Sequence, residues 1–474
     1  MQHPLLSSET GITIETVREQ VVGIDSRVPL FDGRLAPYIN FDNAASTPVL
    51  KPVLDKMYQF MTWYSSIHRG TGFKSQLSSE LYDLAREVVA HFVGLEPQGH
   101  TIIFVKNTTE AINKLANRLN LTPDDVVLVT KMEHHSNDLP WRKRARVVHV
   151  EVDEQGRLRE EDLVQQLERY GAAIKLLAVT GASNVTGWVN DIHRLATLCH
   201  QFGVKILVDA AQLAPHRKIN MKPQSDPAHI DFLAFSAHKL YAPFGAGVLI
   251  GDQDVFVSGE PDVVGGGTVD IVSYDHVEWS APPEKDEAGT PNTVGVLAMV
   301  KALMILEEIG MEQVAAHEAR LTRYALQRLR EIPGIHILGS DNPEAVENRL
   351  GVITFNIDHL HHALVAAILN HEAAIAVRNG CFCAHPYIKQ MLGISDEESA
   401  KLEEAIRRGD RSRIPGAVRV SFGIYNTEWE IDVLIDALNK IARRQWRGNY
   451  ELDRQQGAYT LKPATIDYHR FFQL

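Results

Sequence analysis

Apolar residues in the first two thirds of the chain form short continuous runs, and the segments between them carry apolar residues at every third or fourth position. The runs predict strands at 101–105, 126–130, 147–152, 174–180, 204–208, 232–235 and 248–250. The periodic segments predict helices at 50–64, 78–93, 110–119 and 192–202. Because strands that are apolar throughout must be covered on both faces, this alternation predicts an α/β fold with a mainly parallel sheet.

The pattern changes after Asn292. Two long helices are predicted at 294–308 and 311–331, followed by shorter strands at 335–338, 352–357, 374–376 and 417–422. Short strands separated by helices are typical of a smaller α+β domain. We therefore predict four parts. An N-terminal arm (1–37) has one helical stretch at 16–22, and a large domain (38–295) begins with a strand at 38–41. A small domain (296–448) is completed by the arm, and an extension (449–474) without clear periodicity wraps the surface.

Composition narrows the class of protein. The chain has 474 residues and a net charge of −12, which argues against nucleic acid or an anionic membrane as the main partner. No apolar run approaches the roughly 20 residues of a membrane span, and Met1–Gln20 does not resemble a secretory signal. Three cysteines do not make a disulfide framework in a chain of this size, so we expect a reducing, cytoplasmic location.

The segment after the strand at 232–235 carries the clearest chemical signal. It reads Ser236, Ala237, His238, Lys239, so a lysine lies close behind an apolar run, after a serine and a histidine. An ammonium near a core costs several kcal/mol unless a partner offsets its desolvation, and one such partner is an aldehyde cofactor that forms an imine. Asp209 ends the strand at 204–208 and is placed to pair with a pyridinium nitrogen. Together Lys239 and Asp209 predict pyridoxal 5′-phosphate (PLP).

Other polar residues also follow strands, where open parallel sheets bind ligands. Thr108 and Thr109 open the helix after 101–105 and are suited either to phosphate binding or to simple capping. His134, after the strand at 126–130, either stacks on a flat cofactor ring or lies in a surface turn. The histidines at 359, 361 and 362 are expected to be mostly solvated, and no metal site is expected.

A series of segments in this order resembles the aminotransferase class V group of fold-type I PLP enzymes, and within it the cysteine desulfurases and selenocysteine lyases. The resemblance spans residues 38–439. The segments are Phe41–Ala45, Thr108–Asn113, Glu133–Asn137, Ser183–Gly187, Asp209–Gln212, Ser236–Lys239, Glu287–Asn292 and Arg419–Gly423. The resemblance implies a large domain with a seven-stranded, mainly parallel sheet, a smaller α+β domain, and a homodimer.

The resemblance also implies a role for each matching residue. Lys239 would bond covalently to PLP, His134 would stack on its ring, Asp209 would pair with its nitrogen and Gln212 would contact its phenolic oxygen. The phosphate would be held by Thr109, Ser236 and His238, with Thr108 beside them and Thr290 reaching over from the other subunit. Arg419, assisted by Asn184, would clamp the carboxylate of L-cysteine or a related amino acid.

The cysteine segment, Arg378–Pro386, distinguishes the reaction. By resemblance, Cys383 would be the nucleophile that takes sulfur from the substrate as a persulfide, for transfer to an acceptor protein. Arg378 is expected at the substrate-binding site with Asn184 and Arg419, where its charge would favour the Cys383 thiolate. The run Gly380–Cys383 and an extra polar helical segment at 395–408 are more similar to the desulfurase domain of molybdenum-cofactor sulfurases. Cys381 is either structural or a second thiol that traps an oxidised Cys383.

Alternatives to a desulfurase remain open at this point. Cys383 is also suited to a purely structural role as a small, buried apolar residue. The chain would then be a class V aminotransferase, epimerase or C–S lyase that does not use the cysteine. A non-catalytic scaffold or sulfur-relay protein that kept the fold is the remaining alternative.

Overall fold

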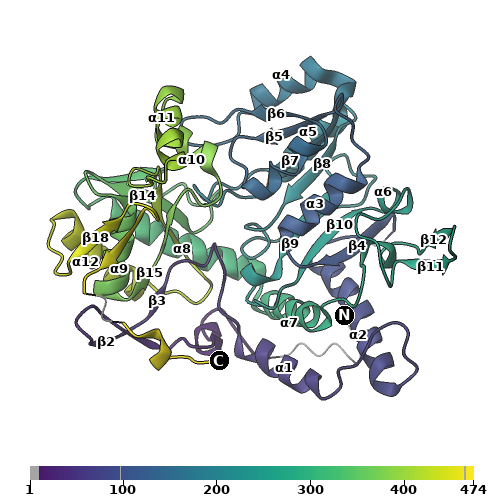
Figure 1. The fold of residues 1–474 in the computed structure, drawn as a ribbon, viewed down its shortest axis with the longest axis horizontal. Helices are drawn as coiled ribbons and strands as arrows, with labels where there is room; N and C mark the ends of the chain where they lie inside the picture. The colour runs from purple at the N-terminus through teal and green to yellow at the C-terminus, as the bar shows by residue number, and fades with distance from the viewer. Residues whose placement is uncertain (1–9, 97, 464–465) are drawn as a thin grey trace.

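A computed structural model describes residues 10–96, 98–463 and 466–474, which form a large lobe and a small lobe side by side (Figure 1). The large lobe is built on a seven-stranded sheet in the order β4-β10-β9-β8-β7-β5-β6, in which only β10 runs antiparallel to its neighbours. This confirms the predicted α/β fold. The strands are β4 (His100–Val105), β5 (Val126–Thr130), β6 (Arg146–Val150), β7 (Ile174–Thr180), β8 (Lys205–Asp209), β9 (Phe232–Ser236) and β10 (Gly247–Asp252).

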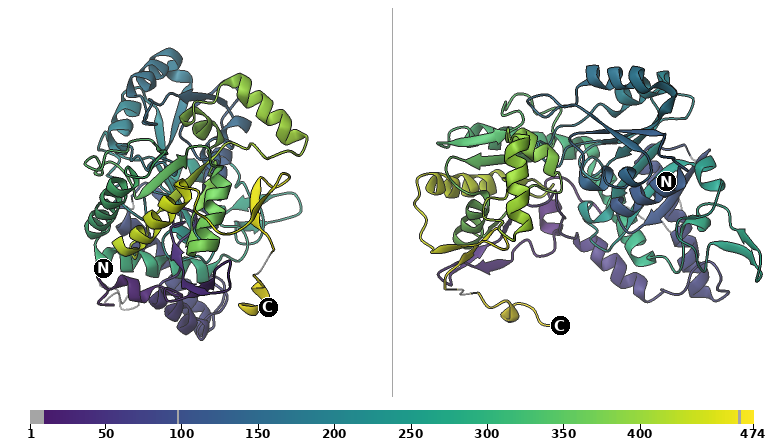
Figure 2. Two further views of the ribbon diagram at one scale, coloured as in Figure 1. Left: turned by 90° about the vertical axis from the view of Figure 1, so that its left-hand side faces the viewer. Right: turned by 45° about the horizontal axis from the view of Figure 1, so that its top comes forward.

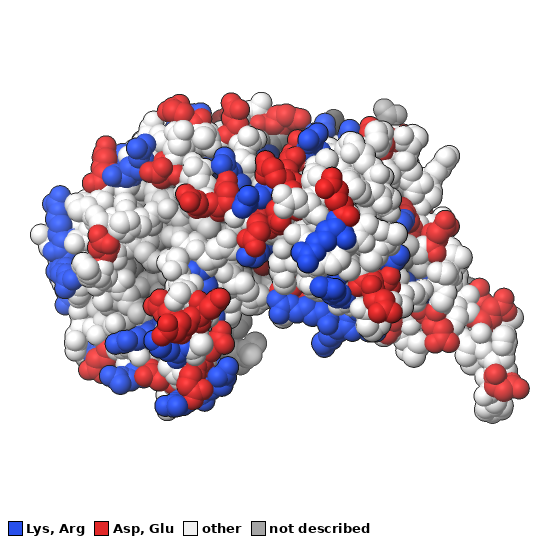
Figure 3. All heavy atoms as spheres, turned by 90° about the horizontal axis from the view of Figure 1, so that it is seen from above, with Lys and Arg blue, Asp and Glu red and all other residues white. Residues whose placement is uncertain are grey.

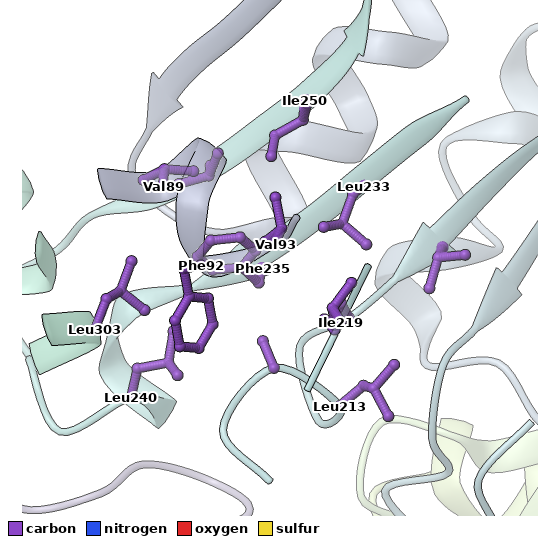
Figure 4. Packing of buried hydrophobic residues seen from close by; sticks show 14 of the residues in the cluster. Val89, Phe92, Val93, Leu213, Ile219, Leu233, Phe235, Leu240, Ile250 and Leu303 are labelled. Carbon is purple, nitrogen blue, oxygen red and sulfur yellow. The ribbon is translucent and has the colours of Figure 1, made fainter. Parts of the chain in front are cut away.

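Side chains of successive strand residues enter two separate hydrophobic clusters, one on each face of the sheet, as the period of two requires. In β8, Ile206 and Val208 belong to one cluster and Leu207 to the other. Figure 4 shows Phe235 of β9 beside Phe92 of α2, and Leu233 of the same strand belongs to the same cluster. The helices of this lobe are α1 (Lys51–Met61), α2 (Phe73–Phe92), α3 (Thr108–Arg118), α4 (Glu160–Tyr170), α5 (Ile192–Gln201), α6 (Gln253–Val257) and α7 (Thr293–Ile309).

The small lobe contains a four-stranded antiparallel sheet in the order β13-β14-β17-β16. The N-terminal segment joins this lobe, because β3 (Ile39–Asn40) pairs with β15 (Ile375–Ala376). The other elements are α8 (Met311–Leu329), β13 (Ile335–Leu338), β14 (Val352–Ile357), α9 (His362–Ala373), β16 (Arg378–Gly380), α10 (His385–Met391), α11 (Asp396–Arg407), β17 (Ala417–Ser421) and α12 (Glu428–Ala442). The domain boundaries at residues 37, 295 and 448 stay predictions. Two elements lie on the other side of these boundaries: the strand expected at 38–41 to begin the large domain pairs with the small lobe, and α7 packs in the core of the large lobe.

Several predicted elements differ from the structure. The helix predicted at 78–93 begins at Phe73, and the stretch at 16–22 is a 3₁₀ turn, Val17–Gln20. A hairpin, β11 (Val269–Val272) with β12 (Val277–Trp279), was not predicted. The aperiodic tail contains a second hairpin, β18 (Tyr450–Asp453) with β19 (Ala458–Leu461), which packs against α9. Short hairpins escape prediction because each strand offers only three or four residues of alternation.

The expectation for the three clustered histidines was wrong in part. His359 is exposed, but His361 is half-buried and His362 is buried. The His362 ring lies between Asn379 Oδ1 and Ile414 O, 3.1 Å from each. His362 is the first residue of α9, whose inner face packs on the sheet, so the helix carries this ring into the core.

The surface carries charged side chains of both signs. Figure 3 shows positive and negative side chains interspersed over one face. The extra polar segment forms α11, capped by Ser395 through Glu398 N, and it lies at the periphery of the small lobe with no buried residue (Figure 2). In the described part of the chain, no helix combines the length and the apolar character needed to cross a membrane.

Candidate active site

A cavity of about 340 Å³ opens where the carboxyl ends of β8 and β9 face the small lobe. Such an edge is the usual ligand site of an open α/β sheet. Most of the predicted site residues line this cavity together. They are Thr108, Thr109, His134, Asn184, Asp209, Gln212, Ser236, His238, Lys239, Arg378, Cys383 and Arg419.

Lys239 and Asp209 reach the cavity from neighbouring strands. Asp209 is the last residue of β8, and Lys239 ends the 3₁₀ turn that follows β9. Burial disfavours the Lys239 ammonium and lowers its pKa to about 8, although Asp209 partly opposes the shift. Burial also raises the pKa of Asp209, while a hydrogen bond from Ala211 N at 2.9 Å works against that shift. The lowered pKa increases the fraction of Lys239 present as the neutral amine, which is the form that acts as a nucleophile.

The N-terminus of α3 forms one wall. Asn107 caps the helix by accepting from Glu110 N, so the two threonines are free for other contacts. Ser236 Oγ accepts from Thr108 N at 2.8 Å and lies 2.6 Å from Thr108 Oγ1. Thr109 Oγ1 lies 2.7 Å from Ser136 Oγ. Hydroxyls and backbone amides at the start of a helix make a site for an anion such as phosphate.

His134 lies over the cavity on the loop after β5. Its Nδ1 accepts from Ser136 N at 3.1 Å, which leaves the ring proton on Nε2. Burial, reinforced by Lys239, lowers the pKa of His134 to about 4, so the ring is neutral at pH 7. Glu133 holds the loop through Thr130 Oγ1, Asn137 Nδ2 and Thr180 N. A neutral, fixed imidazole is suited to stacking on a flat ring.

Arg419 lies buried in β17 and is already engaged. Its Nη1 donates to Asn184 O at 3.0 Å, its Nη2 lies 3.3 Å from Asp42 Oδ1, and its guanidinium stacks 4.9 Å from the Phe382 ring centroid. Its Nε has no hydrogen-bond partner among the described residues. Arg378, by contrast, is exposed and pairs with Asp42 at 2.8 Å. Arg419 therefore keeps a buried, unused donor, a feature suited to a carboxylate ligand.

The cysteine segment is a tight turn between β16 and α10. Cys381 is buried, its Sγ donates to Pro415 O at 3.0 Å, and burial raises its pKa to about 11. Phe382 and Cys383 both have left-handed backbones, with φ of 51° and 55°. Each such residue costs about 1–2 kcal/mol, so the surroundings must hold this conformation. As a result the Cys383 thiol is exposed to the cavity while its neighbours stay in the core.

Two hydrogen bonds from the large lobe hold this turn. Asn184 Nδ2 donates to Phe382 O at 2.8 Å, and His135 N donates to Cys383 O at 2.7 Å. His135 Nε2 also accepts from His385 N at 3.1 Å. The Asn184 amide thus contacts the cysteine turn in this structure, whereas the family resemblance implied that it assists Arg419 at the substrate carboxylate.

The sequence profile of the aminotransferase class-V family matches residues 39–434. The chain belongs to this family. A cysteine desulfurase of Haloferax volcanii is 34% identical over 89% of this chain and 94% of its own length. A probable cysteine desulfurase of Staphylococcus aureus is 34% identical over 91% of this chain and 98% of its own.

Solved structures of similar proteins agree with this assignment. The apo cysteine desulfurase of Thermococcus onnurineus superposes with a TM-score of 0.78 at 30% identity, covering 91% of this chain and 98% of its own. The cysteine desulfurase CsdA of Escherichia coli gives 0.74 at 29% identity, covering 92% and 100%.

The class-V family implies PLP, and the cavity fits it. Gln212 donates from Nε2 to Ala44 O at 2.8 Å, and its buried Oε1 has no partner within the described ranges. Such an orphaned buried atom is expected where a ligand belongs. A cationic ring nitrogen suits Asp209, a phosphate suits Thr109, and an aldehyde suits Lys239.

Some residues of this class-V site were not predicted. Asp42 forms ion pairs with both Arg378 and Arg419. The guanidinium of Arg419 stacks on the Phe382 ring, and the Ser136 hydroxyl lies within hydrogen-bond distance of the Thr109 hydroxyl. Asp42 and Ser136 fall inside segments that carry the family resemblance, which was the available signal. Thr290 lies apart from the cavity, exposed on the loop before α7, so its predicted reach into another subunit stays a prediction.

Proposed function

We propose that this chain is a PLP-dependent cysteine desulfurase that converts L-cysteine to L-alanine and keeps the sulfur as a persulfide on Cys383. The observation that carries the proposal is that Cys383, Lys239 and Arg419 line one cavity. A cysteine that only filled space would not be held in a left-handed turn with its thiol exposed. The names of similar proteins support the same reaction.

Each residue has a defined task in this proposal. Arg419 binds the substrate carboxylate through its unused donor, and Lys239 takes the α-proton. The bound cofactor supplies an electron sink for the carbon that loses this proton. The Cys383 thiolate attacks the substrate sulfur, an S–S bond forms, and the C–S bond breaks with its electrons left on carbon. Protonation of that β-carbon and return of a proton to the α-carbon complete alanine, and the enzyme keeps Cys383 as a persulfide.

The decisive experiment incubates the cofactor-loaded protein with L-cysteine and measures alanine together with the mass of the peptide that contains Cys383. Alanine in a first turnover with one added sulfur on that peptide is the expected result. Alanine without added sulfur on this peptide, or a keto acid in place of alanine, would indicate that the protein catalyses another class-V reaction.

The proposal includes a homodimer, a reducing compartment such as the cytoplasm, and an acceptor protein for the sulfur. Three apolar side chains of α1, α2 and the loop between them, Tyr58, Trp63 and Phe73, are 83%, 46% and 72% exposed, which is costly for a monomer. Thr290 is exposed and free to reach a second subunit. The cysteines at 199, 381 and 383 are free thiols, as expected in a reducing compartment.

We expect Arg419→Lys to raise the KM for L-cysteine with a smaller change in kcat. Lysine loses the planar fork that pairs with a carboxylate. A hydrogen bond to a charged group is worth about 1.5–3 kcal/mol, which corresponds to roughly 10- to 100-fold in KM. Steady-state kinetics measure the effect. Arg320→Lys is the matched control and should change KM little, because Arg320 lies on α8 outside the cavity and pairs with Glu428 at the surface, where salt bridges contribute about 0–1 kcal/mol. An equal effect of both substitutions would contradict the role of Arg419.

The pH dependence of cofactor attachment follows from the pKa of Lys239. Only the neutral amine attacks an aldehyde, and burial lowers this pKa to about 8 in the cofactor-free protein. The rate at which PLP attaches to the apo-protein should rise with pH and level off above about 8. Stopped-flow absorbance at saturating PLP measures this rate. Asp209→Asn should move the midpoint to lower pH, since Asp209 raises the pKa of Lys239. A rate that keeps climbing towards the ordinary lysine pKa would refute the shift.

A further inference from the structure

A second cluster of ligating side chains lies at the opposite end of the sheet from the cavity. His200 is near the end of α5, and His229 and Asp231 lie in the segment that leads into β9. One ligand atom from each lies within 4.8 Å of the others. They flank Lys205, the first residue of β8, whereas Asp209 at the far end of that strand lines the cavity. Four residues of strand span about 13 Å, so the cluster is separate from the active site.

The two imidazoles are oriented by the backbone. His200 Nδ1 lies 2.7 Å from Pro227 O, and His229 Nδ1 lies 2.7 Å from Asp226 O. A carbonyl oxygen only accepts hydrogen bonds, so both Nδ1 atoms carry the proton. Both Nε2 atoms then face Asp231, at 2.9 Å from Oδ2 for His200 and 3.5 Å from Oδ1 for His229. This arrangement resembles metal-binding histidines, whose outer ring nitrogen donates to a carbonyl or carboxylate.

The ligand atoms of the three residues converge. The rings stack with centroids 4.2 Å apart, and each Nε2 faces one oxygen of the Asp231 carboxylate. A divalent cation between the three groups would be bound by both imidazole nitrogens and by the carboxylate. Lys205 Nζ lies 3.9 Å from Asp231 Oδ1 and also pairs with Asp252, so this lysine has a second carboxylate partner.

We propose that His200, His229 and Asp231 bind a divalent transition-metal ion, with zinc the best match. Two imidazole nitrogens and one carboxylate oxygen are ligands that zinc accepts, with water as a fourth. Asp231 also accepts from Ile206 N at 2.8 Å, so the ion would tie the end of α5 and the segment before β9 to the start of β8. The inference is independent of the proposed desulfurase reaction, because none of the three ligands lines the active-site cavity.

Zinc titration of the full-length, tag-free, cofactor-loaded protein tests this site. The protein is first stripped with a chelator, and Cys383 is replaced by Ser throughout because an exposed thiol binds zinc. Zinc is then added in competition with a chromophoric chelator. We expect one equivalent to bind, and His229→Gln to weaken its binding by at least about 100-fold, since even an outer partner of a ligand is worth about 10- to 100-fold.

His193→Gln is the matched control. His193 lies on α5, and its Nδ1 also contacts a carbonyl of the same segment, Ala228 O at 2.8 Å, but it is outside the cluster. Its replacement should leave zinc binding unchanged. Zinc should also raise the melting temperature of the protein with His229 intact and not that of His229→Gln, and cofactor absorbance verifies that each variant is folded. Equal zinc affinity with and without His229, or an equal loss in His193→Gln, would overturn the proposal.

Discussion

Lys239→Ala is expected to lose covalent cofactor attachment and at least about 10²–10⁴-fold in turnover, the usual contribution of a positioned acid–base group. The substitution removes both the amine that bonds to the aldehyde and the base that takes the α-proton. The phosphate cradle at α3 and the Asp209 carboxylate remain, so PLP should still bind without a covalent link. In the unaltered protein, borohydride should fix the cofactor to the peptide that contains Lys239, and mass spectrometry should find no such adduct in Lys239→Ala.

Two controls separate lost chemistry from lost structure. Methylamine added to Lys239→Ala should restore part of the activity, since a small free amine can enter the space left by the side chain. Lys131→Ala removes a lysine that follows β5 and pairs with Glu151 at the surface, and it should keep both activity and the adduct. If borohydride fixes the cofactor to another peptide of Lys239→Ala and turnover is normal, Lys239 is not the residue that binds the cofactor covalently.

The positions of Lys239 and Asp209 were predictable because both follow apolar strands. A buried strand fixes where its end lies, and neighbouring parallel strands end at one edge of the sheet. The pairing of β8 with β9 therefore brings the two residues together without any information about the small lobe. The sequence also located His134 and Thr109 for the same reason, since each follows β5 or β4.

Contacts between distant segments were not predictable in this way. Asp42 meets Arg419 across 377 positions, and no local pattern records that approach. The left-handed turn at Phe382 and Cys383 has no glycine at either residue, so turn chemistry did not reveal it. The cluster of His200, His229 and Asp231 forms because α5 packs beside β8, a tertiary contact that no local pattern records. For this reason no metal site was expected from the sequence.

Cys383→Ser should abolish sulfur transfer while the cofactor stays bound. A serine hydroxyl is a far weaker nucleophile toward sulfur than a thiolate and cannot form a persulfide. We expect alanine formation from L-cysteine to fall by about 10²-fold or more, in line with loss of one catalytic group. The cofactor absorbance should not change, because none of the residues that would hold PLP is altered. The measurements are alanine release, sulfide release with a reductant present, and peptide mass.

Cys381→Ser is the matched control, two residues away in the same turn. The Cys381 thiol donates to Pro415 O, a contact that a serine hydroxyl also makes, and burial keeps its pKa near 11. At neutral pH it is therefore protonated and faces the core. Activity and persulfide should survive this substitution, with at most a modest loss of stability from a hydroxyl in an apolar site. If Cys383→Ser keeps full alanine release, the reaction does not use this cysteine; if Cys381→Ser fails equally, the sulfur is carried by the pair and the separate tasks assigned here are wrong.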